Sequence, residues 1–113
     1  MVEKRKFLRV PQVWKAEIIE RNRCLPIKIR NFTPEGLSFE SLFKIETEES
    51  EILLNSSRGT FRFKVCLRWI KPTDSGYVGG LKILDSSPQD KAFLLLSYLG
   101  KLITYLPLFW RVS

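Results

Sequence analysis

The chain has 113 residues, of which 44% are hydrophobic and 27% charged, the ordinary composition of one soluble domain. At this length folding buries roughly two-thirds of the surface that the unfolded chain exposes, so a core forms without disulfides or metal. Disordered, collagen-like and disulfide-rich chains are excluded. The absence of histidine removes imidazole-based catalysis and most zinc sites, so we expect no enzyme, no metal site and no cofactor.

Charge is distributed unevenly along the chain, whose formal net charge is +7. Residues 1–30 carry a net +6, residues 31–56 a net −5 and residues 57–113 a net +6. The positive potential is therefore local, which suits a discrete anionic ligand as well as nucleic acid. Composition alone does not choose between them.

The two cysteines, Cys24 and Cys66, are far apart in sequence and form no CxxC motif. With no signal peptide before them, they are interpreted as reduced thiols, which predicts a cytoplasmic protein. The longest apolar segment, residues 92–110, is interrupted by Lys101 and Pro107 and falls short of a spanning helix of about 20 residues. We expect no transmembrane span.

Apolar and polar residues alternate through most of the first 85 positions, which is the period of β-strands. Strands are predicted at 14–20, 25–30, 37–42, 51–55, 60–71 and 77–84. The clearest of them has one apolar face with Phe61, Phe63, Val65, Leu67 and Trp69, and one basic face with Arg62, Lys64 and Arg68. So many short antiparallel strands either close into a barrel or pack face to face, and we favour a six-stranded barrel.

The pattern changes at Ser87-Pro88-Gln89-Asp90, which supplies an N-cap and a proline at the first helical position. A helix is predicted from there to residue 106. One apolar stripe of this helix comprises Leu95, Leu99, Leu102, Ile103 and Leu106. Further apolar residues make the apolar surface wider than one packing face requires, namely Phe93, Leu94, Leu96 and Tyr98. The tail Leu108-Phe109-Trp110 caps a barrel end or contacts a second subunit, so a homodimer through helix and tail is one expected partner.

A basic segment with an RxxxR motif precedes the first strand and contains Lys4, Arg5, Lys6 and Arg9. A guanidinium pairs in bidentate fashion with phosphate or with guanine O6 and N7, which an ammonium group cannot do. The alternative interpretation is a solvated tail that aids solubility.

A second motif, Asn31-x-Thr33-x-x-Gly36, lies between two predicted strands. The asparagine side chain offers a donor and an acceptor, the threonine hydroxyl donates to phosphate, and glycine lets the backbone approach a ligand. The alternative is a turn that uses these residues for its backbone angles alone.

Together the two motifs resemble the bipartite signature of the PilZ domain, RxxxR followed by [D/N]xSxxG, a bacterial receptor for cyclic di-GMP. Further similarity lies in Arg9-Val10-Pro11, in Gly36-Leu37-Ser38-Phe39, and in Trp69 followed by Gly79-Gly80-Leu81-Lys82-Ile83. The resemblance covers residues 3–105. It implies a mainly β fold, a six-stranded antiparallel barrel with a C-terminal α-helix.

The resemblance also implies a ligand site. Arg5 and Arg9 would bind guanine bases and phosphates of cyclic di-GMP from a segment that orders on binding. Asn31, Thr33 and Gly36 would form the other wall, and further candidates are Lys4, Lys6 and Gly80. The chain departs from the family pattern at Thr33, where serine is usual, at Leu8, where proline is frequent, and at Lys6, where arginine is common.

These interpretations give one domain with a basic arm at 1–11, a barrel at 12–86, a helix at 87–106 and an apolar tail at 107–113. As the resemblance implies, it would signal to an unidentified effector protein in motility, biofilm attachment or exopolysaccharide output. One alternative is a PilZ-like adaptor that contacts proteins without binding the nucleotide. Another is a barrel that binds single-stranded nucleic acid. The predicted place of Trp69 on the apolar face, away from Arg62 and Arg68, argues against that barrel, so no DNA partner is expected.

Overall fold

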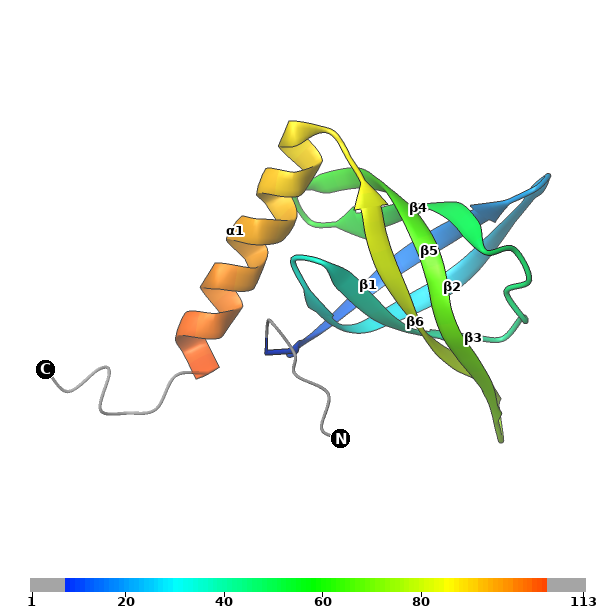
Figure 1. Cartoon of the computed structure of the whole chain (residues 1–113). Coiled ribbons are helices and arrows are strands. Elements are labelled where there is room, and N and C mark those ends of the chain that lie inside the picture. The colour runs from blue at the N-terminus through cyan, green and yellow to red at the C-terminus, as the bar shows by residue number, and fades with distance from the viewer. Residues whose placement is uncertain (1–7, 106–113) are drawn as a thin grey trace, which may run out of the picture.

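The computed structural model describes residues 8–105, which form six strands and one helix (Figure 1). The elements are β1 (Val10–Glu20), β2 (Arg23–Thr33), β3 (Gly36–Ser41), β4 (Glu49–Ser56), β5 (Gly59–Thr73), β6 (Gly76–Asp85) and α1 (Pro88–Tyr105). The strands are antiparallel and close into a barrel in the order β1-β2-β3-β6-β5-β4. The predicted six-stranded barrel with a C-terminal helix is confirmed.

Each strand lies where the alternation predicts it, but two boundaries change the interpretation of the motifs. β1 begins at Val10, which pairs with Phe32, so Val10 and Pro11 belong to the barrel rather than to the arm. β2 extends to Thr33, which pairs with Gly36. Asn31 and Thr33 are therefore on β2 and Gly36 is on β3, and only residues 34–35 form the turn.

The barrel interior is filled by the apolar face of each strand. The largest fully buried side chains include Phe32, Phe39, Phe63, Ile18, Ile29, Ile52 and Leu54. Burial of each side chain of this size contributes roughly 1.5–3 kcal/mol. The interior thus fixes the register of the strands, because a shift by one residue would move every such side chain to the outside.

Trp69 departs from the predicted alternation. The pairing of β5 with β6 shifts between Leu67 and Trp69, which leaves Arg68 as the extra residue of a β-bulge. Leu67 pairs with Leu81 and faces inward, whereas Trp69 pairs with Gly80 on the outside and is 41% exposed. The prediction that Trp69 lies on the apolar face was wrong, and Ile70 packs against the core in its place.

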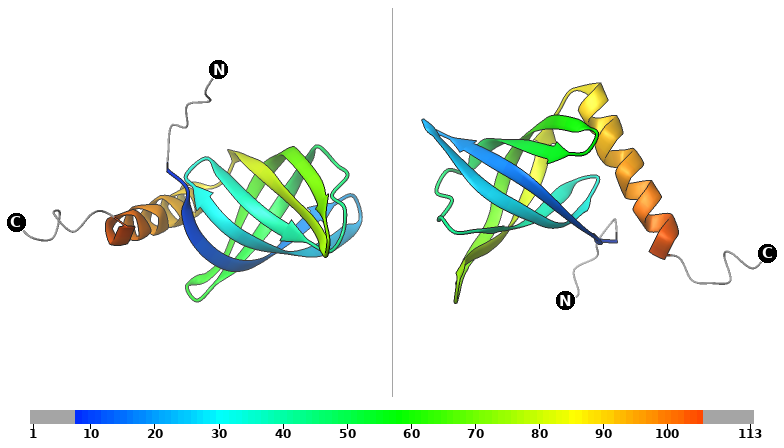
Figure 2. Two further views of the ribbon diagram at one scale, coloured as in Figure 1. Left: turned by 90° about the horizontal axis from the view of Figure 1, so that it is seen from below. Right: turned by 180° about the vertical axis from the view of Figure 1, so that it is seen from behind.

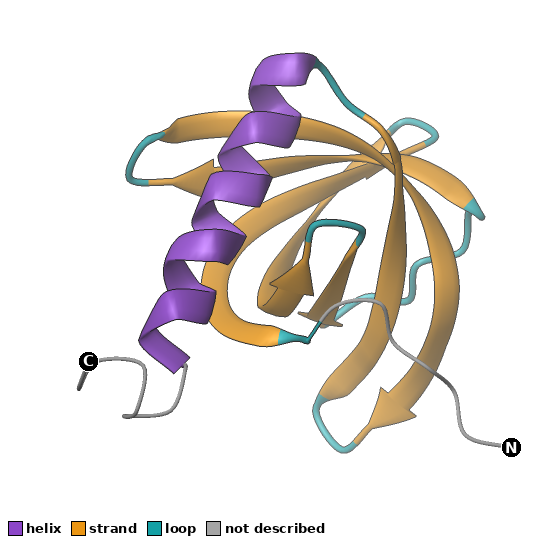
Figure 3. Ribbon diagram, turned by 60° about the vertical axis from the view of Figure 1, so that its left-hand side comes forward, coloured by secondary structure: helices purple, strands orange, loops and turns teal. Residues whose placement is uncertain are grey.

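Helix α1 lies across one end of the barrel (Figures 1 and 3). The Ser87 hydroxyl oxygen accepts a hydrogen bond from the backbone N–H of Asp90, 3.1 Å away, which confirms the predicted N-cap. Phe93 stacks on Phe61 with ring centroids 3.7 Å apart, and Tyr98 lies edge-on to Phe32. Aromatic contacts therefore hold the helix at the open end of the barrel.

Three residues of the apolar stripe predicted for this helix, Leu95, Leu99 and Ile103, are exposed rather than packed against the barrel. Phe93, Leu94 and Tyr98 are buried there instead, because their rings and side chains fill the barrel end. Of the stripe, Leu102 is partly buried, and Leu106 lies outside the described residues, as does the tail at 107–113. The helix thus has an exposed apolar outer face made of Leu95, Leu96, Leu99 and Ile103.

Two further views show the helix standing apart from most of the barrel wall (Figure 2). Within residues 8–105, no helix is both long and apolar enough to cross a membrane.

Candidate functional site

Thr33 stabilises the β2–β3 hairpin through its side chain. Its hydroxyl oxygen accepts hydrogen bonds from the backbone N–H groups of Glu35 and Gly36, both at 3.1 Å. A hydroxyl has two acceptor positions and one donor proton. Because the turn uses both acceptor positions, the Thr33 hydroxyl can still donate its proton to a group outside the turn.

Gly36 lies where the hairpin approaches β6 closely. It pairs with Lys82, and a Cβ at this position would be 3.0 Å from the carbonyl oxygen of Leu81. The backbone N–H of Ile83 also donates to the carbonyl oxygen of Glu35 at 2.9 Å. The hairpin is therefore held against β6 by backbone contacts that leave little room for a side chain.

Asn31 carries an unsatisfied polar atom. Its Oδ1 is buried and makes no hydrogen bond with any residue in the described part of the chain. A buried acceptor without a donor costs about 1–3 kcal/mol. Because Phe32 points into the core, Asn31 lies on the outer face of β2.

Asn31 is the first member of a row of opposite residues that crosses four strands on the outside of the barrel. This outer row consists of Asn31, Ser38, Gly80 and Trp69 on β2, β3, β6 and β5. A Cβ on Gly80 would collide with the Nε1 of Trp69, so the indole lies directly over the glycine. The predicted site residue Gly80 thus provides space for a large exposed ring beside the hairpin.

Cationic side chains flank the hairpin. Val10 lies opposite Phe32 and Pro11 opposite Asn31, so continuing this register places Arg9 at the level of Thr33. Because Val10 points inward, the exposed Arg9 before it lies on the outer face. On the other side Lys82 is exposed and makes no ion pair with a described residue. Arg9 and Lys82 therefore place two positive charges beside the hairpin, whose turn carries the carboxylate of Glu35.

The remaining predicted residues of the basic segment, Lys4, Arg5 and Lys6, lie outside the described residues. Their neighbour Leu8 is within them, and its carbonyl oxygen accepts a hydrogen bond from the Tyr98 hydroxyl at 2.7 Å. Leu8, the residue before Arg9, is therefore joined to α1.

Sequence reasoning missed Trp69, Ser38 and Lys82 as neighbours of the site. The Gly79-Gly80 pair was the available signal, because glycine in a strand often marks the close approach of another group. The bulge that turns Trp69 outward depends on pairing with β6 and has no local signature.

Metal-binding geometry is absent from the described residues, where no three cysteine, aspartate or glutamate side chains cluster. Cys24 is exposed and Cys66 is half-buried, and neither is in a disulfide, as predicted.

The closed six-stranded barrel with its C-terminal helix has a PilZ-like fold. It is similar to the PilZ domain of YcgR from Escherichia coli, solved with c-di-GMP, with a TM-score of 0.70 at 15% sequence identity, over 90% of this chain and 94% of that one. It is also similar to the inhibitor of motility MotI/DgrA from Bacillus subtilis, with a TM-score of 0.75 at 11% identity, over 93% of this chain and 54% of that one. The chain thus spans about half the length of MotI/DgrA. No protein-family model and no curated protein matches the sequence.

Proposed function

We propose that this protein is a receptor for cyclic di-GMP, which it binds at the β2–β3 hairpin. The observation that carries the proposal is the unsatisfied Oδ1 of Asn31, which shares the outer face with the Thr33 hydroxyl and Arg9. Cyclic di-GMP offers two phosphates and two guanine edges. The hairpin offers an acceptor, a hydroxyl proton and positive charge, which complement those groups.

Each residue has a chemical role in this proposal. Arg5 and Arg9 pair with guanine O6 and N7 or with phosphate oxygens, for which a guanidinium is suited. Asn31 accepts a hydrogen bond from a guanine N–H, Thr33 donates to a phosphate, and Gly36 lets the ligand approach the backbone. Lys4, Lys6 and Lys82 add positive charge, and Gly80 leaves space at the site for the ring of Trp69.

The signal would pass from the arm to α1. Ligand binding fixes the basic segment against the hairpin, and the bond between Leu8 and Tyr98 joins that segment to the helix. The outer face of α1 would then contact an effector protein or a second copy of the chain. Motility is the first process to examine, since MotI/DgrA is an inhibitor of motility. Biofilm attachment and exopolysaccharide output are further candidates.

Calorimetric titration with cyclic di-GMP tests the proposal, with cyclic di-AMP and GTP as controls at the same salt concentration. Saturable, guanine-selective binding is expected. Arg9→Ala should weaken it by about 5- to 150-fold, since one bidentate contact contributes roughly 1–3 kcal/mol. Lys44→Ala removes the same charge at the opposite end of the barrel and should leave the affinity unchanged. Absence of binding to the wild type, or unchanged affinity in Arg9→Ala, would contradict the proposed site.

The outward position of Trp69 supports a second candidate function, binding of single-stranded nucleic acid. Trp69 is exposed together with Arg68 and Lys71 on the outside of β5. The prediction that Trp69 faces away from the basic residues therefore no longer argues against a surface on which bases stack. Fluorescence anisotropy with a labelled oligonucleotide would detect this function. Steep loss of binding with salt and no response to cyclic di-GMP would favour it over the receptor.

The third interpretation, an adaptor that contacts proteins only, requires neither ligand. It is favoured if calorimetry and thermal shift both show no response to cyclic di-GMP. Sedimentation at several protein concentrations then tests whether the outer face of α1 joins two copies of the chain.

A further inference from the structure

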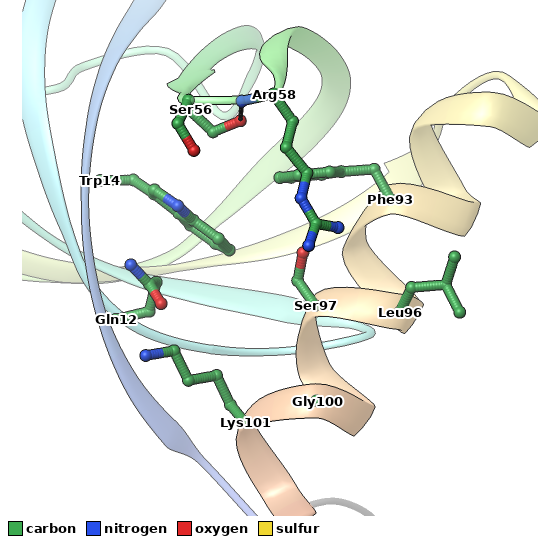
Figure 4. Close-up of a pocket in the computed structure, with 10 residues that line it drawn as sticks. Gln12, Trp14, Ser56, Arg58, Phe93, Leu96, Ser97, Gly100 and Lys101 are labelled. Carbon is green, nitrogen blue, oxygen red and sulfur yellow. Dashed lines mark hydrogen bonds between the residues drawn. The ribbon is translucent and has the colours of Figure 1, made fainter. Parts of the chain in front are cut away.

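A cavity of about 360 Å³ lies between α1, the start of β1 and the β4–β5 turn (Figure 4). Its volume is within the range of small-molecule sites, roughly 300–1,000 Å³. β1 pairs with β2 along one edge, where Asn31 lies, whereas on the other edge its pairing with β4 begins only at Lys15. The cavity occupies this second edge, so it is separate from the hairpin site.

Two cationic side chains from different elements reach into the cavity. Arg58 comes from the β4–β5 turn and Lys101 from α1 (Figure 4). Among the described residues that line it there is no aspartate or glutamate. Arg58 makes no ion pair within the described residues, whereas the nearby Arg62 binds Glu51 at 3.4 Å. The cavity therefore presents positive charge without a carboxylate to neutralise Arg58.

Aromatic rings form the inner wall of the same cavity. The rings of Trp14 and Phe93 have centroids 5.7 Å apart and are tilted by 42°. The amide of Gln12 and the hydroxyl of Ser97 lie beside them in Figure 4. A ligand that fits this wall needs a planar apolar part next to its anionic group.

Gly100 leaves the helix side of the cavity without a side chain. It lies inside α1, where glycine costs about 1 kcal/mol relative to alanine. A Cβ at this position would meet no atom within 4 Å, so packing among the described residues does not require a glycine. Gly100 lines the cavity, so an alanine there would place a methyl group in it.

We propose that this cavity binds an organic phosphate with an aromatic group, at most about the size of a mononucleotide. Arg58 and Lys101 neutralise the phosphate, Trp14 and Phe93 contact the ring, and Gly100 leaves room for it. This site goes beyond the cyclic di-GMP receptor function and does not depend on it, because the two sites lie on opposite edges of β1.

NMR titration of the whole chain with phenyl phosphate tests the proposal, with inorganic phosphate and phenol as separate probes. Saturable shifts are expected at the amides of Arg58, Ser97 and Gly100. Phenyl phosphate should bind at least about tenfold more tightly than either fragment, because the cavity contacts both of its parts. Shifts that do not saturate, or equal affinities for all three probes, would overturn the proposal.

Variants separate binding from folding. Arg58→Ala and Lys101→Ala should each weaken phenyl phosphate binding several-fold, while Lys44→Ala, a distant loss of the same charge, should not. Gly100→Ala should raise the melting temperature of the protein and at the same time lower its affinity for phenyl phosphate. If Gly100→Ala is more stable and binds phenyl phosphate as the wild type does, the cavity is not the site.

Titration of the same variants with cyclic di-GMP distinguishes the two proposals. Arg58→Ala should bind cyclic di-GMP as the wild type does. If the wild type binds phenyl phosphate but no cyclic di-GMP, only the receptor function fails. If it binds cyclic di-GMP but no phenyl phosphate, only the cavity proposal fails.

Discussion

The side chain of Glu20, at the end of β1, accepts a hydrogen bond from the backbone N–H of Thr47, 3.0 Å away, and a second from the Thr47 hydroxyl at 2.7 Å. The backbone N–H of Glu46 and the guanidinium of Arg23 donate to the same carboxylate. Glu20 is only 2% exposed. A buried carboxylate with four donors therefore fastens the β3–β4 loop to the barrel.

These contacts make stability depend on acid pH. Burial raises the pKa of Glu20, but the hydrogen bonds from Thr47, Arg23 and Glu46 outweigh it and lower the pKa from 4.5 to about 2. Because the pKa is lower in the folded protein, the ionised Glu20 adds about 3 kcal/mol to the free energy of unfolding above pH 4.5. This contribution is lost as the pH falls toward 2. Glu20→Gln should therefore be less stable than the wild type at pH 7, with a smaller difference at pH 3. Urea unfolding at both pH values measures this, and an equal difference at both would contradict the ionised role of Glu20.

Substitutions at Thr33 separate its turn-forming oxygen from its methyl group. Thr33→Val removes the acceptor of two backbone N–H groups and should cost about 1 kcal/mol of stability. It should also weaken cyclic di-GMP binding, because the donated proton is lost. Thr33→Ser keeps the hydroxyl and should match the wild type in thermal unfolding and in calorimetry. If Thr33→Val bound the ligand unchanged, the hydroxyl would have no part in recognition.

Two adjacent glycines should respond differently to alanine. A Cβ on Gly79 would lie 2.6 Å from the Phe39 ring and from the Trp69 carbonyl oxygen, so Gly79→Ala should destabilise the core by at least about 1–3 kcal/mol. The three atoms nearest to a Cβ on Gly80 belong to the indole of Trp69, which is partly exposed and can turn away. Gly80→Ala should therefore cost less stability but change Trp69 fluorescence. Equal melting temperatures for the two variants would argue against this difference.

Tyr98→Phe tests the connection between the arm and the helix. The variant keeps the ring against Phe32 but loses the bond to the Leu8 carbonyl, worth about 1 kcal/mol. We expect slightly lower stability together with weaker cyclic di-GMP binding, since the segment that carries Arg9 is no longer joined to α1. Thermal unfolding and calorimetry measure the two effects. An affinity identical to that of the wild type would show that ligand binding does not depend on this bond.

The barrel could be predicted from sequence because each strand has one buried face, and a period of two is a local property of the chain. The hairpin of Thr33 and Gly36 was predictable for a similar reason, since its turn chemistry is contained in six residues. The place of Trp69 was not, because the bulge at Arg68 arises from pairing with a strand ten or more residues away.

The orientation of α1 was unpredictable for a different physical reason. The helix is apolar on more than one face, and its own sequence does not determine which face is buried. The choice is made by Phe61 and Phe32, which lie far from the helix in sequence and contact Phe93 and Tyr98. The cavity beside Gly100 likewise needs three separate elements and leaves no contiguous motif.

Closure of the six strands has a mechanical consequence. In an open sheet one strand can slide against its neighbour, whereas in a ring a slip at one seam must be matched at every other seam. The spacing between Asn31 and Trp69 is therefore as fixed as the circumference of the barrel. A closed barrel of this kind does not change its own shape readily. A conformational response to a ligand would therefore involve the segments attached to its ends, such as α1.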